Sequence, residues 1–150
     1  MIRLLRLILS AASTTFLLAC AVEPNTSYVV PLPESTDADV VADAMATFVA
    51  LRLPASSTLF LDPAPPGQTG NTVTTDFIAA LRDRGFAVNE AGVMPGPHRI
   101  RYLVTPLGNG DLVRLTIDRT TGGSQFFARS PGGGLQAGGP FTVTETEATE

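Results

Sequence analysis

The 150-residue chain has one cysteine, one histidine, no tryptophan and no lysine. A lone cysteine excludes an intramolecular disulfide, and a single histidine beside it cannot complete the four protein ligands of a structural zinc site. The aspartates and glutamates are scattered singly, without the spacing of a calcium-binding EF-hand loop. From these absences we predict no metal site and no bound cofactor.

Sequence motifs that carry enzymatic chemistry are also missing. No serine lies in the Gly-x-Ser-x-Gly context that marks the nucleophile of many hydrolases. Gly132-Gly133-Gly134 is followed by neither Lys nor Ser/Thr, so it does not match a phosphate-binding loop. His98 follows Pro97 and is typical of a solvated residue at the start of a strand, with a catalytic base as the alternative. We predict no catalytic residue and no enzymatic activity.

The chain has no surplus of positive charge, since 14 acidic residues stand against 10 basic ones. An acidic surface is repelled by the phosphate backbone of nucleic acids, so we expect no direct contact with DNA or RNA. Every basic residue is an arginine. This composition agrees with a GC-rich coding sequence or, alternatively, with selection for bidentate ion pairs.

What the chain does have is an N-terminus built like a secretory signal peptide. Arg3 and Arg6 give it a positive start, and residues 4–18 form an apolar run shorter than the roughly 20 residues of a membrane-spanning helix. The run ends in Leu17-Leu18-Ala19-Cys20, which has the form of a bacterial lipobox. We predict cleavage before Cys20 and lipidation of its thiol. The alternatives are an uncleaved anchor, or cleavage elsewhere beside an unmodified cysteine.

Lipidation of Cys20 would attach the mature protein to a membrane outside the cytoplasm. Two or three acyl chains anchor a protein stably, because each buried CH₂ contributes about 0.8 kcal/mol. Ala21 follows the cysteine, whereas an aspartate there would favour retention in the inner membrane. We therefore expect anchoring in the outer membrane, with the domain facing the periplasm.

The chain after the signal peptide has the length of one domain. Residues 1–19 are the predicted lipoprotein signal peptide, and residues 20–34 are the lipidated cysteine and a proline-rich tether. Residues 35–145 are predicted to form a single α+β domain, and residues 146–150 an acidic tail.

Two helices and two strands are predicted in the first half of the domain. Ser35-Thr36-Asp37 offers capping groups to a helix that Pro54 ends, and Asn71 or Thr72 offers one to a helix that runs to about residue 84. Gly85 and Phe86 fit the left-handed ending of that second helix. Residues 57–61 and 86–89 flank it as candidate parallel strands. Apolar residues at helical spacing should face the core: Val40, Val41, Ala44, Met45, Phe48, Val49, Val73, Phe77, Ile78 and Leu81.

The second half of the domain predicts an antiparallel meander. Residues 98–105 and 112–118 alternate in polarity, Asn109-Gly110 predicts the hairpin between them, and Thr121-Gly122-Gly123 is expected to turn into a strand at 125–129. Residues 131–140 are interpreted as a loop with little order, and residues 141–144 as a last edge strand. The fold class is then α+β, with two helices packed on one face of a mixed, mostly antiparallel sheet (α-β-α-β followed by a β-meander). The inward strand residues are Ile100, Tyr102, Val104, Val113, Leu115 and Ile117.

Four arginines are expected on the solvent face of this meander: Arg99, Arg101, Arg114 and Arg119. One interpretation is a basic patch for an acidic partner or for lipid headgroups. The other, which we favour, is cross-strand pairing with Asp111 and Asp118 on an ordinary wet surface.

Several of these features recur in one known family: the lipobox Leu17-Leu18-Ala19-Cys20, the helix at 39–51, the strand Thr58-Leu59-Phe60-Leu61-Asp62, and the block at 76–88 before the meander. In them the whole chain resembles the TrbH family of conjugal transfer lipoproteins. The resemblance implies a part in mating-pair formation, the type IV secretion apparatus that transfers plasmid DNA. Only Cys20 carries over as a functional residue. The implied partners are the membrane, through the lipid on Cys20, and envelope proteins of the apparatus.

The leading hypothesis is therefore an outer-membrane-anchored structural lipoprotein of that apparatus, with no small-molecule substrate. Residues 141–144 are its candidate contact, because an edge strand can accept a strand from a partner. One alternative is a periplasmic ligand-binding or envelope-maintenance lipoprotein unrelated to conjugation, and the ligand-binding form would need a concave apolar pocket. A periplasmic enzyme is the other alternative, and it would need catalytic groups that the sequence lacks.

Overall fold

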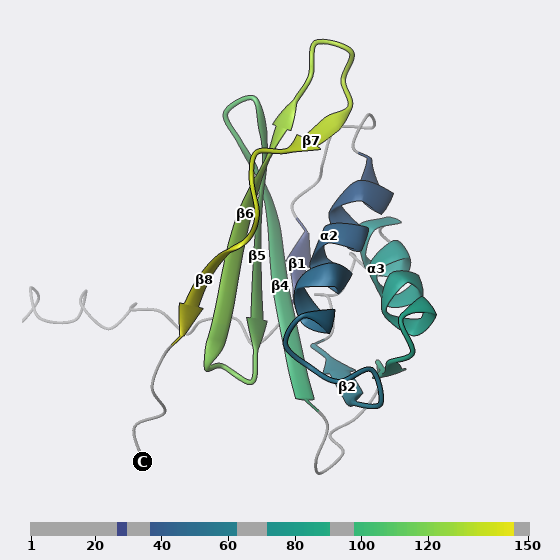
Figure 1. Ribbon diagram of the computed structural model, residues 1–150. Helices are drawn as coiled ribbons and strands as arrows, with labels where there is room; N and C mark the ends of the chain where they lie inside the picture. The colour runs from purple at the N-terminus through teal and green to yellow at the C-terminus, as the bar shows by residue number, and fades with distance from the viewer. Residues whose placement is uncertain (1–26, 30–36, 63–71, 91–97, 146–150) are drawn as a thin grey trace, which may run out of the picture.

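The computed structural model describes residues 27–29, 37–62, 72–90 and 98–145. These residues form one eight-stranded mixed sheet and two helices, which pack side by side on one face of the sheet (Figure 1). The predicted α+β class, with both helices on one face of a mostly antiparallel sheet, is confirmed.

The centre of the sheet is the predicted antiparallel meander of β4 (His98–Leu107), β5 (Gly110–Ile117) and β6 (Thr121–Arg129). Alternate residues of β4 and β5 are buried against the helices, as their polarity pattern predicts. The β4–β5 hairpin lies at the expected place, but its two loop residues are Gly108 and Asn109. Gly108 has a φ of +59° and Asn109 is not among the residues with a positive φ, which together give the geometry of a type II′ turn.

Short strands extend both edges of the meander. Beside β4 lie β2 (Thr58–Leu61) and β1 (Tyr28–Val29), both parallel to it, and β3 (Ala87–Asn89) pairs in parallel with β2. Beside β6 lie β7 (Leu135–Ala137) and β8 (Thr142–Glu145), both antiparallel to it. The predicted parallel pair around the second helix is therefore present. β1 comes from the segment that the sequence assigns to the tether.

The two helices, α2 (Ala38–Ala50) and α3 (Thr72–Asp83), bury the faces that their apolar spacing predicts, with one exception. Val40 is 36% exposed. The apolar positions of α2 cover a wider arc than the sheet can bury, and Val40 lies at the rim of that arc, beside α3. The prediction that Val40 faces the core is wrong.

The helix ends show one expected and one unexpected arrangement. After α3, the Phe86 N–H donates to the Leu81 carbonyl at 3.1 Å and the Gly85 N–H to the Arg82 carbonyl at 2.9 Å. Gly85 has a φ of +89°, so this is the predicted Schellman ending. Asp37 occupies the N-cap position of α2, but its side chain makes no capping bond there. Its Oδ2 accepts a 2.8 Å hydrogen bond from the Leu135 N–H instead.

Two predictions about glycine-rich segments are wrong. Gly122 and Gly123 lie inside β6, and the turn is formed by residues 118–120. A Cβ on Gly123 would lie 2.4 Å from the ring of Phe48, so this glycine allows α2 to approach the sheet closely. Within residues 131–140, β7 is ordered because Leu135 is only 5% exposed and packs in the core.

Candidate functional site

Cys20, the predicted lipidation site, lies outside the described residues. The first described residue after it is Ser27, which is fully buried. The Ser27 Oγ accepts a 3.4 Å hydrogen bond from the Tyr102 N–H, and β1 then pairs with Leu103 and Val104. The chain is thus fixed to the edge of β4 seven residues after Cys20.

The predicted arginine face lies on the side of the sheet away from the helices. Arg99 and Arg101 in β4, and Arg114 in β5, alternate with residues that are buried against the helices. Arg99 pairs with Asp62, whose Oδ1 is 2.6 Å from the Arg99 Nε and whose side chain is 4% exposed. Arg101 and Arg119 line the same small depression as this pair, whereas Arg114 is exposed. Ion pairing is therefore present on this face, but the partner of Arg99 is Asp62.

Asp118, one of the two predicted partners, binds the start of β4. Its Oδ2 is 2.6 Å from the Nδ1 of His98, and its Oδ1 accepts a 2.7 Å hydrogen bond from the Arg99 N–H. The His98 side chain is 38% exposed, which agrees with a partly solvated residue at a strand start. These bonds hold the β5–β6 turn against β4, and they give His98 a structural contact.

Asp111, the other predicted partner, is on the opposite face and fully buried. Its Oδ2 accepts a 2.8 Å hydrogen bond from the Nη2 of Arg129, while its Oδ1 has no hydrogen-bond partner among the described residues. Burial raises the pKa of the Asp111 carboxyl, and the charge of Arg129 offsets part of that increase. Because Arg129 also donates to the Gly133 carbonyl at 3.3 Å, the pair ties β5 and β6 to the turn before β7.

An open groove lies between α2 and α3 and reaches β6 and β7. Small side chains, among them Ala44, Ala79 and Ala80, line it, together with four aspartates from the two helices: Asp39, Asp43, Asp76 and Asp83. The helix face of the molecule is therefore acidic around this groove.

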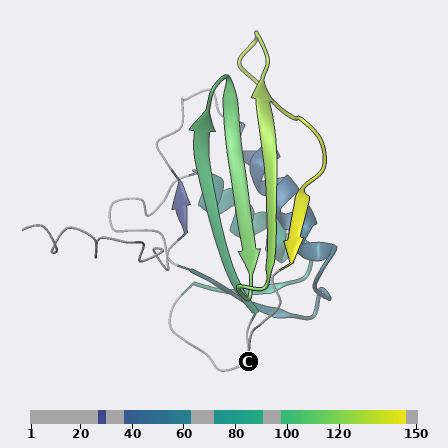
Figure 2. The same ribbon diagram turned by 90° about the vertical axis from the view of Figure 1, so that its left-hand side faces the viewer.

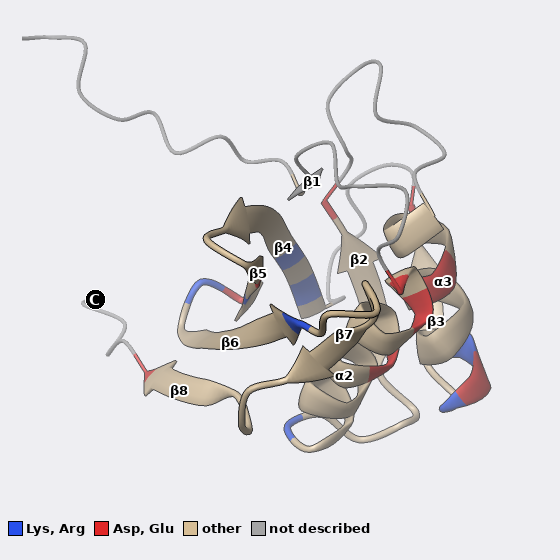
Figure 3. Ribbon diagram, turned by 90° about the horizontal axis from the view of Figure 1, so that it is seen from above, with Lys and Arg blue, Asp and Glu red and all other residues tan. Residues whose placement is uncertain are grey.

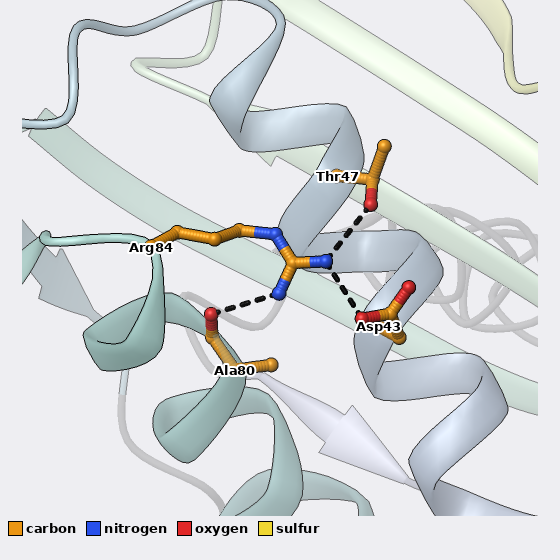
Figure 4. Close-up of polar contacts among 4 residues, drawn as sticks. All are labelled: Asp43, Thr47, Ala80 and Arg84. Atoms are coloured by element: carbon orange, nitrogen blue, oxygen red, sulfur yellow. Dashed lines mark hydrogen bonds and ion pairs between the residues drawn. The ribbon is translucent and has the colours of Figure 1, made fainter.

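Arg84 bridges the two helices beside the groove (Figure 4). Its Nη2 lies 2.6 Å from the Asp43 Oδ1 and donates to the Thr47 Oγ1 at 3.1 Å, while its Nη1 donates to the Ala80 carbonyl at 3.0 Å. The guanidinium thus joins the end of α3 to the middle of α2 and offsets one of the four aspartates.

The predicted edge strand is present as β8. All four of its residues are exposed, including Val143 at 44%. Within the described part of the chain, β8 pairs with β6 alone, so its other side is an open strand edge.

Within residues 27–29, 37–62, 72–90 and 98–145, no three His, Cys, Asp or Glu side chains gather as a possible metal site. No helix in those ranges is long and apolar enough to cross a membrane.

Sequence reasoning did not identify Asp62 or Arg84 as partners in ion pairs, and it placed the pairing of Asp111 on the wet face. Asp111 did carry a readable signal, because it is in phase with Val113 and Leu115 on the buried side of β5. A charged residue in such a position requires a partner.

The family model described as conjugal transfer protein TrbH matches residues 22–147, a range that contains every described residue. Comparisons with curated proteins and with solved structures found no match.

Proposed function

The chain belongs to the TrbH family of conjugal transfer proteins, and we propose that it is an outer-membrane lipoprotein that joins the mating-pair apparatus through surface contacts. The family match over residues 22–147 is the observation that carries a role in conjugal transfer. The lipobox ending in Cys20 supports the anchor, and Ala21 after it supports the outer membrane. The role is structural and involves no reaction or small-molecule substrate.

The free edge of β8 is the contact that this proposal uses. An unpaired strand edge presents backbone N–H and C=O groups that can bind an extended segment of another protein. β8 is exposed along its whole length, and Val143 adds an apolar side chain at that edge. We propose that an envelope protein of the secretion apparatus adds a strand there.

The groove between α2 and α3 does not favour the alternative of a ligand-binding lipoprotein. Small-molecule sites are mostly concave and apolar, with a few convergent polar groups. This groove is open and bordered by four aspartates. It resembles an exposed acidic surface more than a pocket for an apolar ligand.

Plasmid transfer in a strain that lacks the protein tests the proposal. Complementation with the wild-type chain should restore transfer, whereas Cys20→Ser should abolish lipid labelling, leave the precursor uncleaved and lower transfer. Val143→Asp places a charge on the β8 edge and should reduce transfer about tenfold, the effect of losing about 1.4 kcal/mol of binding free energy.

Leu51→Asp is the matched control, because Leu51 is a 77% exposed apolar residue outside the sheet. It should transfer plasmid at the wild-type frequency, and both variants should accumulate and be lipidated normally. Normal transfer in the strain without the protein would refute the secretion role. Equal transfer by the two aspartate variants would refute the β8 contact but not the secretion role.

A further inference from the structure

One face of the sheet is not covered by any described helix or strand (Figure 2). We call this side of β4, β5 and β6, which points away from α2 and α3, the open face. Leu112 and Phe126 are directly paired across it, and Leu103 lies on the neighbouring strand, all three only partly buried. Arg114 lies opposite Leu103, and Arg99 and Arg101 follow along β4. Apolar and arginine side chains thus share one surface, as they do on elements that bind to anionic bilayers.

Charge is distributed unevenly between the two sides of the molecule (Figure 3). The open face and its β5–β6 turn carry four arginines: Arg99, Arg101, Arg114 and Arg119. Among the described residues, Asp62 and Asp118 are carboxylates that lie near them. The helix side carries the four aspartates around the groove, and Arg82 and Arg84 at the end of α3 offset part of the acidic charge there. An anionic membrane surface attracts the first side and repels the second.

The chain between the predicted anchor and the sheet is short. Ser27 lies seven positions after Cys20, with six residues between them, and even a fully extended chain over those seven steps spans at most about 25 Å. This reach is shorter than the strand β4, whose ten residues span about 33 Å. Since Ser27 and β1 are bonded to β4, a lipid on Cys20 keeps this edge of the sheet close to the membrane.

We propose that the open face lies against the anionic membrane that holds the lipid, so that the acidic helix face and its groove point into the periplasm. This inference rests on the proposed lipidation of Cys20. The short connection confines the domain to the membrane surface, and the charges and apolar side chains of the open face determine which side meets the headgroups.

Fluorescence quenching on the lipidated mature protein tests this orientation. The protein would be reconstituted in phosphatidylethanolamine vesicles with or without phosphatidylglycerol, some lipids carrying a headgroup quencher. Because the Cys20 thiol is acylated, an added cysteine is the only free thiol. Ser124→Cys labels the open face and Ala79→Cys labels the exposed side of α3. We expect several-fold stronger quenching at position 124 with phosphatidylglycerol present, and weaker quenching at about 1 M salt, where the screening length is about 3 Å.

Arg114→Glu should reduce the difference between the two labels, while Arg114→Lys, which keeps the charge, should preserve it. Equal quenching at both positions in vesicle-bound protein, or stronger quenching at position 79, would overturn the orientation and leave lipidation intact. Self-quenching between labels at position 124 would assign the open face to a second copy and also overturn it. Protein that carries no lipid and does not float with the vesicles would overturn both this inference and the proposed anchor.

Discussion

The two faces of the sheet differ in what determines their residues. On the helix side, the inward residues of β4 and β5 from Ile100 to Val104 and from Val113 to Ile117 are at most 3% exposed and apolar. On the open face, arginine, threonine and leucine are mixed, and their side chains are partly buried or exposed. Packing dictates the first set, because each side chain must fill space between sheet and helix. Packing against the helices does not constrain the second set, so polar and charged side chains are tolerated there.

The largest expected effect is at the closest contact of the helix side. Phe48→Ala should lower the free energy of unfolding by about 3–5 kcal/mol, as large truncations in a core do. Gly123→Ala should cost about 1–3 kcal/mol, because a Cβ there would overlap the Phe48 ring. Denaturant unfolding of the single and double variants measures both.

The double variant provides the sharper test. Once Phe48 is alanine, the remaining close contact of the methyl group of Gly123→Ala is with the Phe141 ring at 3.1 Å, so most of its additional cost should vanish. Strict additivity of the two changes would mean that the Phe48 ring does not lie over Gly123. A cost of Phe48→Ala within about 0.5 kcal/mol of zero would show that α2 does not bury this side chain.

Local patterns predicted most of the fold. The alternation along β4 and β5 and the Gly85-Phe86 helix ending each depend on neighbours a few residues away, and both are confirmed. Gly123 was misplaced because two glycines typically form a turn, and the reason for this one is a ring 75 positions earlier in the chain. Leu135 was missed because a three-residue strand has too little pattern to stand out from a glycine-rich segment.

The contacts in the candidate sites were less predictable than the fold, because several of them join residues that are far apart in the sequence. The Cys20 motif is local, so it was identified from the sequence and stays a prediction. Asp62 and Arg99 are 37 residues apart, and no spacing rule joins them. The prediction that Asp111 pairs on the wet face is wrong. The alternation of residues along β5 places Asp111 on the buried side, so the sequence did contain the signal.

An intermediate effect on stability is expected when Asp111, the buried carboxylate of β5 on the helix side, loses its charged partner. Arg129→Met leaves the Asp111 carboxylate without its charged partner and should cost about 1–3 kcal/mol at neutral pH. The folded-state pKa of Asp111 is raised, so the folded protein binds its proton more tightly than the unfolded chain does. The contribution of Asp111 to stability is therefore largest below its ordinary pKa and is lost as the pH rises through the folded-state pKa.

The cost of Arg129→Met should accordingly shrink as the pH falls from about 7 towards about 4, close to the ordinary aspartate pKa. Urea unfolding at several pH values, with Arg129→Lys as the variant that keeps the charge, measures this dependence. A cost that does not change with pH would show that Asp111 is ionised throughout, or that it is not desolvated.

The smallest expected effect is that of Arg114→Ala, and it is compared with a substitution at the next residue, which lies on the other face of the sheet. Leu115 is 1% exposed on the helix side of β5, and Leu115→Ala should cost about 2–5 kcal/mol. Arg114, one position earlier, is exposed on the open face, so Arg114→Ala should change the free energy of unfolding by no more than about 0.5 kcal/mol. If Arg114→Ala destabilised the domain as much as Leu115→Ala, the open face would be part of the core, and its arginines would need no membrane to explain them. If stability is unchanged while membrane orientation is lost, Arg114 serves the surroundings of the protein and not its fold.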